Sequence, residues 1–185
     1  MKQRLLPIIA VVLSLLFLSS CADNDNTETY FIHAVSFSQK GQNQVEISAI
    51  CEKSGDEKCF VISGSGKTPD DAAEKLSKEY KDCYFATCKV YFFEKDTSTV
   101  FLKDIAHKIC ESNIFPTKSH VIIITGTSPE KLLNTVKSKQ QLTDLIKSAK
   151  GKEKNVVHFL SAITLRKDID APTVDYSDYK RKGNK

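Results

Sequence analysis

Two neighbouring stretches of the chain alternate between apolar and polar side chains, and this alternation restricts the fold more than any other feature. The pattern runs through residues 30–37 and is repeated in residues 44–51. A period of two residues is typical of a β-strand with one buried face. The polar segment 38–41 between the two stretches ends in glycine, so the region predicts a β-hairpin. The side chains expected on its buried face are Phe31, Val35, Phe37, Val45, Ile47 and Ala49.

Short apolar segments and amphipathic helices follow the hairpin. The segment 120–125 is apolar on both faces, which indicates a central strand. Thr68-Pro69-Asp70-Asp71 indicates a helix start, because Thr is a good N-cap, Pro suits the first helical position, and acidic residues favour the positive end of the helix dipole. Further strands are expected at 59–63 and 87–93, and helices at about 68–83, 99–110, 127–136, 142–151 and 156–163.

The N-terminus has the form of a lipoprotein signal peptide. Lys2 and Arg4 precede an apolar run over residues 5–18, and Ser19 and Ser20 lead into Cys21. This order of basic, apolar, small and cysteine residues is that of a secretory signal. The run is short for a membrane span, which takes about 20 apolar residues. The pattern therefore predicts cleavage before Cys21 and a diacylglyceryl group on its thiol, with a plain signal peptide as the alternative.

These patterns predict an α+β fold: a mixed sheet of about five strands with helices packed on it, followed by a two-helix extension. Beyond residue 168 we expect only a tail, with its basic residues at Lys180, Arg181, Lys182 and Lys185. The expected segments are a signal peptide at 1–20, a polar tether at 21–29, an α+β domain at 30–137, a helical extension at 138–170 and a basic tail at 171–185.

Charge and cysteine content restrict the class of function. Without Lys2 and Arg4, the 27 basic residues fall to 25 against 23 acidic ones, so the net charge of the chain is close to zero. This balance argues against a nucleic-acid-binding protein. Five cysteines remain after Cys21, an odd number, in a compartment that permits disulfides. A bridge between Cys51 and Cys59 across a hairpin, a pairing of Cys83 with Cys88, and small buried thiols all remain open. None of the spacings matches a zinc site, so no metal is expected.

No sequence motif points to catalysis. Residues 64–68 read Gly-Ser-Gly-Lys-Thr, but a phosphate-binding loop needs a further glycine at position 61, which is Val61. The four histidines, His33, His107, His120 and His158, lie on different predicted elements. The aromatic clusters at 84–85 and 91–93 are expected to pack in the core, with a ligand groove as the alternative.

The order of motifs resembles the N-terminal domain of the Ger(x)C (GerAC-like) family, the C-subunit lipoproteins of nutrient germinant receptors in endospore-forming bacteria. The likeness rests on Cys21, FIHAVSFSQKGQNQVEISAI, VISGSGKTPDDAAEKL, CKVYFFEKD, HVIIITGTSPEKLL and LTDLIKSAKGKEKNVVHFLSAI, and it covers most of residues 30–170. The family usually has Trp-Asp directly after the lipid cysteine, whereas this chain has Ala22-Asp23.

The resemblance implies a non-enzymatic subunit or accessory of a spore germinant receptor, without a catalytic residue or cofactor. Its expected partners are membrane lipid, through the diacylglyceryl group on Cys21, and the integral membrane subunits of the receptor. Its expected location is the outer, extracytoplasmic face of the spore inner membrane. The alternative is an extracytoplasmic solute-binding or other interaction lipoprotein unrelated to germination. A solute-binding protein would need a pocket of a few hundred Å³ with convergent polar groups.

Overall fold

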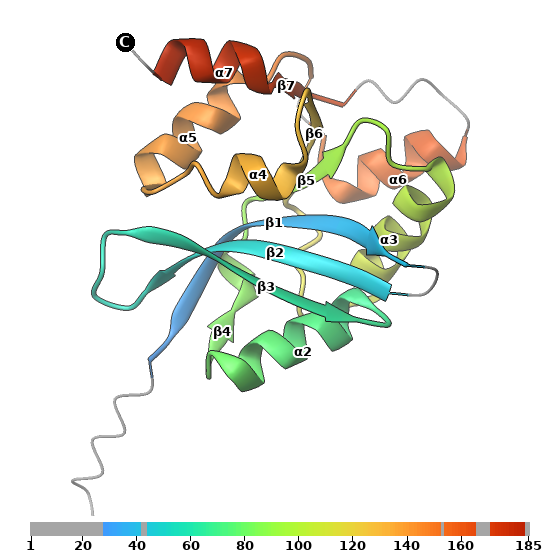
Figure 1. Cartoon of the computed structure of the whole chain (residues 1–185). Coiled ribbons are helices and arrows are strands. Elements are labelled where there is room, and N and C mark those ends of the chain that lie inside the picture. Colours follow the sequence, from blue (N-terminus) through green and yellow to red (C-terminus); the bar gives the residue numbers. More distant parts are fainter. Residues whose placement is uncertain (1–27, 42–43, 153, 166–170, 184–185) are drawn as a thin grey trace, which may run out of the picture.

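A mixed sheet lies between two groups of helices in the computed structural model, which describes residues 28–41, 44–152, 154–165 and 171–183 (Figure 1). The strands are β1 (Tyr30–Lys40), β2 (Gln44–Lys53), β3 (Cys59–Gly66), β4 (Cys83–Tyr84), β5 (Val90–Glu94), β6 (His120–Thr125) and β7 (Thr173–Asp175). The helices are α2 (Pro69–Glu79), the 3-10 helix η2 (Phe85–Thr87), α3 (Thr99–Glu111), α4 (Pro129–Leu133), α5 (Lys139–Ser148), α6 (Val156–Thr164) and α7 (Tyr176–Gly183).

The sheet combines an antiparallel half with a parallel half. Its order is β3-β2-β1-β5-β6-β7, and β4 pairs with the start of β1. β1, β2 and β3 are antiparallel neighbours, whereas β5, β6 and β7 run parallel to β1. The amino ends of β1, β5 and β6 therefore lie at one end of the sheet, and their carboxyl ends lie at the opposite end.

The predicted hairpin is formed by β1 and β2, with Lys40 opposite Gln44 at its closed end. An irregularity in the register between Ile32 and Ala34 changes the expected set of buried side chains. Ile32, rather than Phe31, shares the buried face with Val35 and Phe37. An extra residue in a strand reverses the faces of the side chains that precede it, and a simple alternation in sequence does not reveal it.

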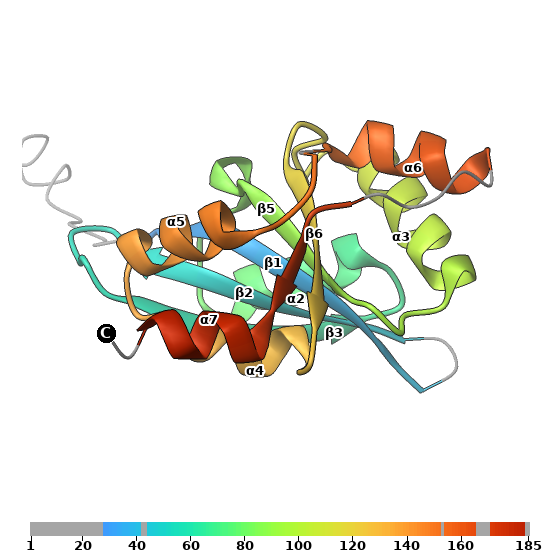
Figure 2. The same cartoon turned by 90° about the horizontal axis from the view of Figure 1, so that it is seen from above.

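Each face of the sheet has its own hydrophobic core. Figure 1 shows α2 below the sheet and α4, α5 and α7 above it, and Figure 2 shows these last three helices crossing the strands. One core contains Leu76 of α2, Ile105 of α3 and Phe159 of α6. The other contains Leu132 of α4 and Leu145 of α5. β6 supplies Val121 and Ile123 to the first core and Ile122 and Ile124 to the second, as expected of a central strand.

The α+β fold class is confirmed, with two additional short strands and a different role for the C-terminal part. The sheet has seven strands rather than about five, because β4 also pairs with β1 and β7 also pairs with β6. The two helices expected as an extension pack on the sheet: α5 covers the second core, and Phe159 of α6 stacks on Phe93 of β5.

The segment expected as a basic tail forms β7 and α7. Val174 of β7 is buried against the second core, and Tyr176 and Tyr179 of α7 pack on it. This corrects the expectation for residues 171–183. A three-residue strand is too short for a periodic signal, and its partner β6 lies about fifty residues earlier in the chain.

In the part of the chain that the structure describes, no helix combines the length and the apolar character that crossing a membrane requires.

Candidate functional site

The Gly-Ser-Gly-Lys-Thr segment joins β3 to α2 and has a packing role. A Cβ atom on Gly66 would lie 2.5 Å from the backbone nitrogen of Ala72, so only glycine lets the helix come this close to the strand. Thr68 is the N-cap: its Oγ1 accepts from the Asp71 N–H, and Asp71 Oδ2 accepts from the Thr68 N–H, both at 3.1 Å. The rejected phosphate-binding motif is thus a capped, closely packed helix start.

Cys51 and Cys59 are both free thiols, so the bridge considered between them is absent. In the β2–β3 register Cys51 lies opposite Phe60, and Cys59 lies opposite Glu52. The two thiols therefore point to opposite faces of the sheet, and each is buried in a different core. A shift of one residue reverses the face of a side chain, which explains why the sequence spacing suggested a pair that the fold separates.

None of the five described cysteines is a good candidate for a nucleophile. All five are free, and Cys51, Cys59 and Cys88 are buried. Burial raises the pKa of Cys51 and of Cys88 to about 12 and that of Cys83 to about 11, and it also raises the pKa of Cys59 and Cys110. Because the thiolate is the reactive form, these side chains are unreactive near neutral pH. Cys21 lies outside the described residues.

A polar cluster of His33, Glu52 and Lys139 joins the sheet to α5. Glu52 Oε2 lies 2.8 Å from Lys139 Nζ and 3.5 Å from His33 Nε2. His33 and Glu52 are buried, at 9% and 8% exposure. Burial lowers the pKa of His33, the Lys139 charge lowers it further, and Glu52 opposes both effects. The cluster therefore has a buried imidazole that is neutral near pH 7 beside a paired carboxylate.

A hollow of about 490 Å³ lies beside β7, where β5 and β6 end, and is one candidate for a ligand site. Leu102, Ile123 and Val174 are its apolar lining residues. Its charged lining residues are Lys95, Lys150, Asp175 and Asp178. The volume falls within the range of small-molecule sites, so the chemistry of these polar groups decides what the hollow can do.

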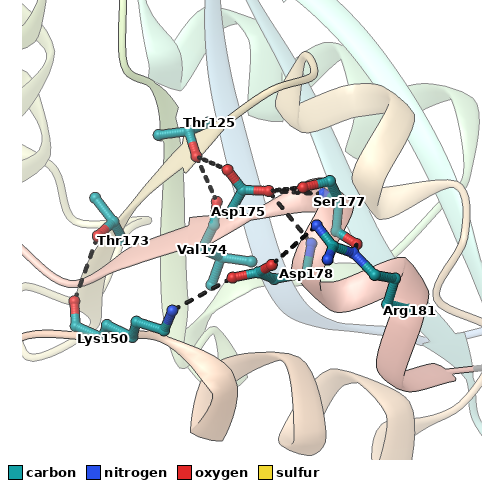
Figure 3. A network of polar contacts seen from close by, with 8 residues as sticks. All are labelled: Thr125, Lys150, Thr173, Val174, Asp175, Ser177, Asp178 and Arg181. Atoms are coloured by element: carbon teal, nitrogen blue, oxygen red, sulfur yellow. Dashed lines mark hydrogen bonds and ion pairs between the residues drawn. The ribbon is translucent and has the colours of Figure 1, made fainter.

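Asp175 organises the start of α7. Its Oδ1 accepts from the backbone N–H groups of Ser177 at 2.8 Å and Asp178 at 3.3 Å, and its Oδ2 accepts from Thr125 Oγ1 at 3.2 Å (Figure 3). The hydrogen bond from the Ser177 side chain, and then that from the Asp178 backbone N–H, lower the pKa of Asp175. Asp175 therefore stays ionised and joins β6, β7 and α7.

Two of the remaining charged residues in the hollow, Lys150 and Asp178, pair with one another. Asp178 lies 3.3 Å from Lys150 Nζ and 3.5 Å from an Arg181 nitrogen, as Figure 3 shows. The side chains of Lys150 and Arg181 are 78% and 77% exposed, so these ion pairs lie in solvent. Ion-pair networks of this kind also serve purely structural roles. The arrangement holds α7 against the sheet and does not form a catalytic constellation.

Other predicted candidates remain apart. His107 lies on α3 and His158 on α6, both exposed, while His33 and His120 lie on β1 and β6. Within the described ranges, no three His, Cys, Asp or Glu side chains gather closely enough to hold a metal ion. Phe85 and residues 91–93 are buried in the core, as expected. Tyr84 is 51% exposed, so the packing role expected of it is wrong.

The network around Asp175 was missed at the sequence level, although a local signal is present. An acidic residue directly before a helical segment is a typical N-cap, and Asp175 precedes Tyr176-Ser177-Asp178. The contact of Asp175 with Thr125 has no such signal, because it depends on the pairing of β6 with β7.

Comparison with known proteins adds one match. A family model described as spore germination protein N-terminal domain matches residues 22–174. No curated protein and no solved structure matches the chain.

Proposed function

The chain belongs to the spore germination protein family whose N-terminal domain matches residues 22–174, and on this premise we propose that it is a non-enzymatic, lipid-anchored subunit or accessory of a nutrient germinant receptor. The family match over these residues carries the proposal. The resemblance to GerAC-like proteins inferred from the motifs agrees with this match.

The anchor is proposed at Cys21, directly before the first residue of the family match. Two acyl chains hold a protein on a bilayer far better than one. The segment 22–29 spans at most about 26–29 Å when fully extended. A tether of this length keeps the body that begins at β1 close to the lipid surface, on the extracytoplasmic face of the spore inner membrane.

The proposed role is assembly with the integral membrane subunits of the receptor. Confinement to a surface raises the effective concentration of a protein near its membrane partners without tight contacts. The raised pKa values of the buried thiols and the paired charges beside β7 support a role in binding rather than in catalysis.

The anchor is tested by mass spectrometry of the chain purified from membranes of the sporulating host. We expect a mature chain that begins at Cys21 and carries the mass of a diacylglyceryl group. The variant Cys21→Ala should lack this mass, and the matched variant Cys110→Ala, changed at a partly buried free thiol, should retain it. An unacylated N-terminus in the unchanged chain would refute the anchor.

The role in germination is tested with spores that carry the same two variants. We expect Cys21→Ala to slow germination in response to nutrients and Cys110→Ala to germinate like the unchanged strain. Equal germination of all three strains, and of a strain that lacks the gene, would contradict the proposed role in the receptor.

A further inference from the structure

A second hollow, of about 560 Å³, lies at the amino ends of β5 and β6, between the loops that lead into these strands and α5. Its charged lining residues are Lys89, Lys118 and Lys147, and His120, Thr143 and Ile146 also face it. Lys89 precedes β5, Lys118 precedes β6, and Lys147 lies in the last turn of α5. Two loops and a helix therefore bring three ammonium groups to one hollow.

Among the residues that the structure describes, no carboxylate pairs with the three lysines. The described lining contains no aspartate or glutamate. Among the ion pairs of the described residues, none involves Lys89, Lys118 or Lys147. All three side chains belong to exposed residues. This hollow differs in that respect from the one beside β7, where Lys150 and Asp178 pair. A concave site with three unpaired cations attracts anions.

The backbone around the hollow is held in place. The Lys89 N–H donates to the His33 carbonyl, and the Lys89 carbonyl accepts from the His120 N–H, both at 2.9 Å. Ser119, which is 3% exposed, donates from Oγ to the Cys88 carbonyl at 2.8 Å. These bonds fix the starting points of the Lys89 and Lys118 side chains. The site is therefore largely formed before a ligand arrives.

The lysine-lined hollow and an acidic hollow lie at opposite ends of the sheet. A hollow at the carboxyl ends of β1 and β5 is lined by Glu94, Asp96 and Glu130 and by no basic residue. The lysine-lined hollow lies at the end of the sheet where the chain enters β1, because β5 and β6 are parallel to β1.

We propose that the hollow lined by Lys89, Lys118 and Lys147 binds the phosphate group of an anionic phospholipid headgroup. The proposal rests on the proposed function in placing this end of the domain next to a bilayer. Lysine ammonium groups are common ligands of phosphate, and basic residues near an anionic membrane surface add to its binding. The contact orients the tethered domain, with the hollow lined by Glu94, Asp96 and Glu130 away from the lipid.

The test uses the full chain with Cys21→Ala in every sample, so that acylation does not contribute. The site variant also carries Lys89→Gln, Lys118→Gln and Lys147→Gln. The control carries Lys67→Gln, Lys95→Gln and Lys103→Gln, which removes the same charge from exposed lysines away from the amino ends of β5 and β6. Binding is measured by sedimentation with vesicles of phosphatidylcholine alone and with vesicles that also contain phosphatidylglycerol.

We expect the site variant to lose about tenfold or more of its partition onto phosphatidylglycerol vesicles. The control should lose less than about threefold, because charges far from the surface are screened by salt. Binding to phosphatidylcholine alone should be the same for both. Equal losses in the two variants, or no loss in either, would overturn the proposal.

A titration with inorganic phosphate distinguishes the source of the anion. If phosphate alone shifts the NMR signals of Lys89, Lys118 and Lys147 while phosphatidylglycerol vesicles bind both variants equally, the ligand is a free phosphate and the lipid assignment is wrong. Because Cys21→Ala is present throughout, these results are independent of the acylation test. A result that refutes lipid binding at the hollow is therefore distinguishable from a result that refutes acylation of Cys21.

Discussion

Single residues decide how closely the elements of this domain approach one another. Gly64 and Gly66 of β3 lie against α2, where an added Cβ would lie 2.8 Å from Leu76 Cγ and 2.5 Å from the Ala72 nitrogen, respectively. The Gly66 contact is with helix backbone, which cannot move aside as a flexible side chain does. The absence of a side chain at position 66 thus sets the distance between the strand and the helix.

The first prediction concerns this contact. Gly66→Ala should lower the free energy of unfolding by about 1–3 kcal/mol, because overpacking forces the helix away from the strand. Ser65→Ala, at the position between the two glycines, should change it by less than about 0.5 kcal/mol. Urea unfolding followed by circular dichroism measures both. Equal stability of the two variants would mean that α2 shifts at little cost.

The second prediction concerns the buried imidazole of His33. Its folded-state pKa is lowered by burial and by Lys139, whereas Glu52 opposes the shift and Lys89 adds a small lowering effect. The unfolded chain therefore binds the proton more readily than the folded chain. The free energy of unfolding should fall as the pH decreases through about 6.5, the unfolded value, and level off below the lowered folded value.

The variant His33→Gln should show a smaller loss of stability than the unchanged chain between about pH 7.5 and about pH 5, since it lacks this titration. His107→Gln, on the exposed face of α3, is the control and should retain the full loss. The measurement is urea unfolding at both pH values. An identical pH dependence in all three proteins would argue against the assignment to His33.

At the scale of elements, α2 shows how local signals act together. Thr68 caps the helix, Pro69 starts it, and Asp71 completes a reciprocal pair of hydrogen bonds with Thr68. Its apolar face, with Ala72, Ala73 and Leu76, is buried on β3. Because a cap and an amphipathic stripe are encoded within a few residues, this helix start was predictable from the sequence.

The third prediction tests the cap. Thr68→Ala should cost about 1 kcal/mol of stability, because the Asp71 N–H loses its hydrogen-bond acceptor. Lys67→Ala removes an exposed neighbour that does not cap the helix, and its effect should stay within about 0.5 kcal/mol. The midpoints of urea unfolding of the two variants give the comparison. A cap that contributes nothing would leave both midpoints unchanged.

At the scale of the whole molecule, the C-terminal strand and helix complete the domain. β7 pairs with β6 at the edge of the sheet, where Val174 lies opposite Ile124. Tyr176 and Tyr179 of α7 pack on the same core, and Asp175 joins α7 to β6 through Thr125. A segment with the composition of a solvated tail therefore protects the edge of the sheet and part of the second core.

The fourth prediction compares two adjacent positions of β7. Val174→Asp should lower the free energy of unfolding by about 3 kcal/mol or more, because it buries an unpaired charge in the second core. Thr173→Asp, at an exposed position, should cost less than about 1 kcal/mol. Urea unfolding with a near-ultraviolet probe measures both changes. Similar small effects would indicate that residues 173–183 are indeed a dispensable tail.

Local patterns determined the elements of this protein: the hairpin, the capped start of α2 and the central strand β6 were all predictable, because the periodicity of a segment records which of its faces is buried. The leader and Cys21 likewise form a local pattern that predicts a lipid anchor.

Tertiary structure alone decided the strand register and the contacts between distant segments. The irregularity near His33 placed Ile32 in the core, the β2–β3 register separated Cys51 from Cys59, and the pairing of β7 with β6 turned an expected tail into part of the sheet. The meeting of Lys89, Lys118 and Lys147 at one hollow has the same origin, because only the packed sheet and α5 bring them together.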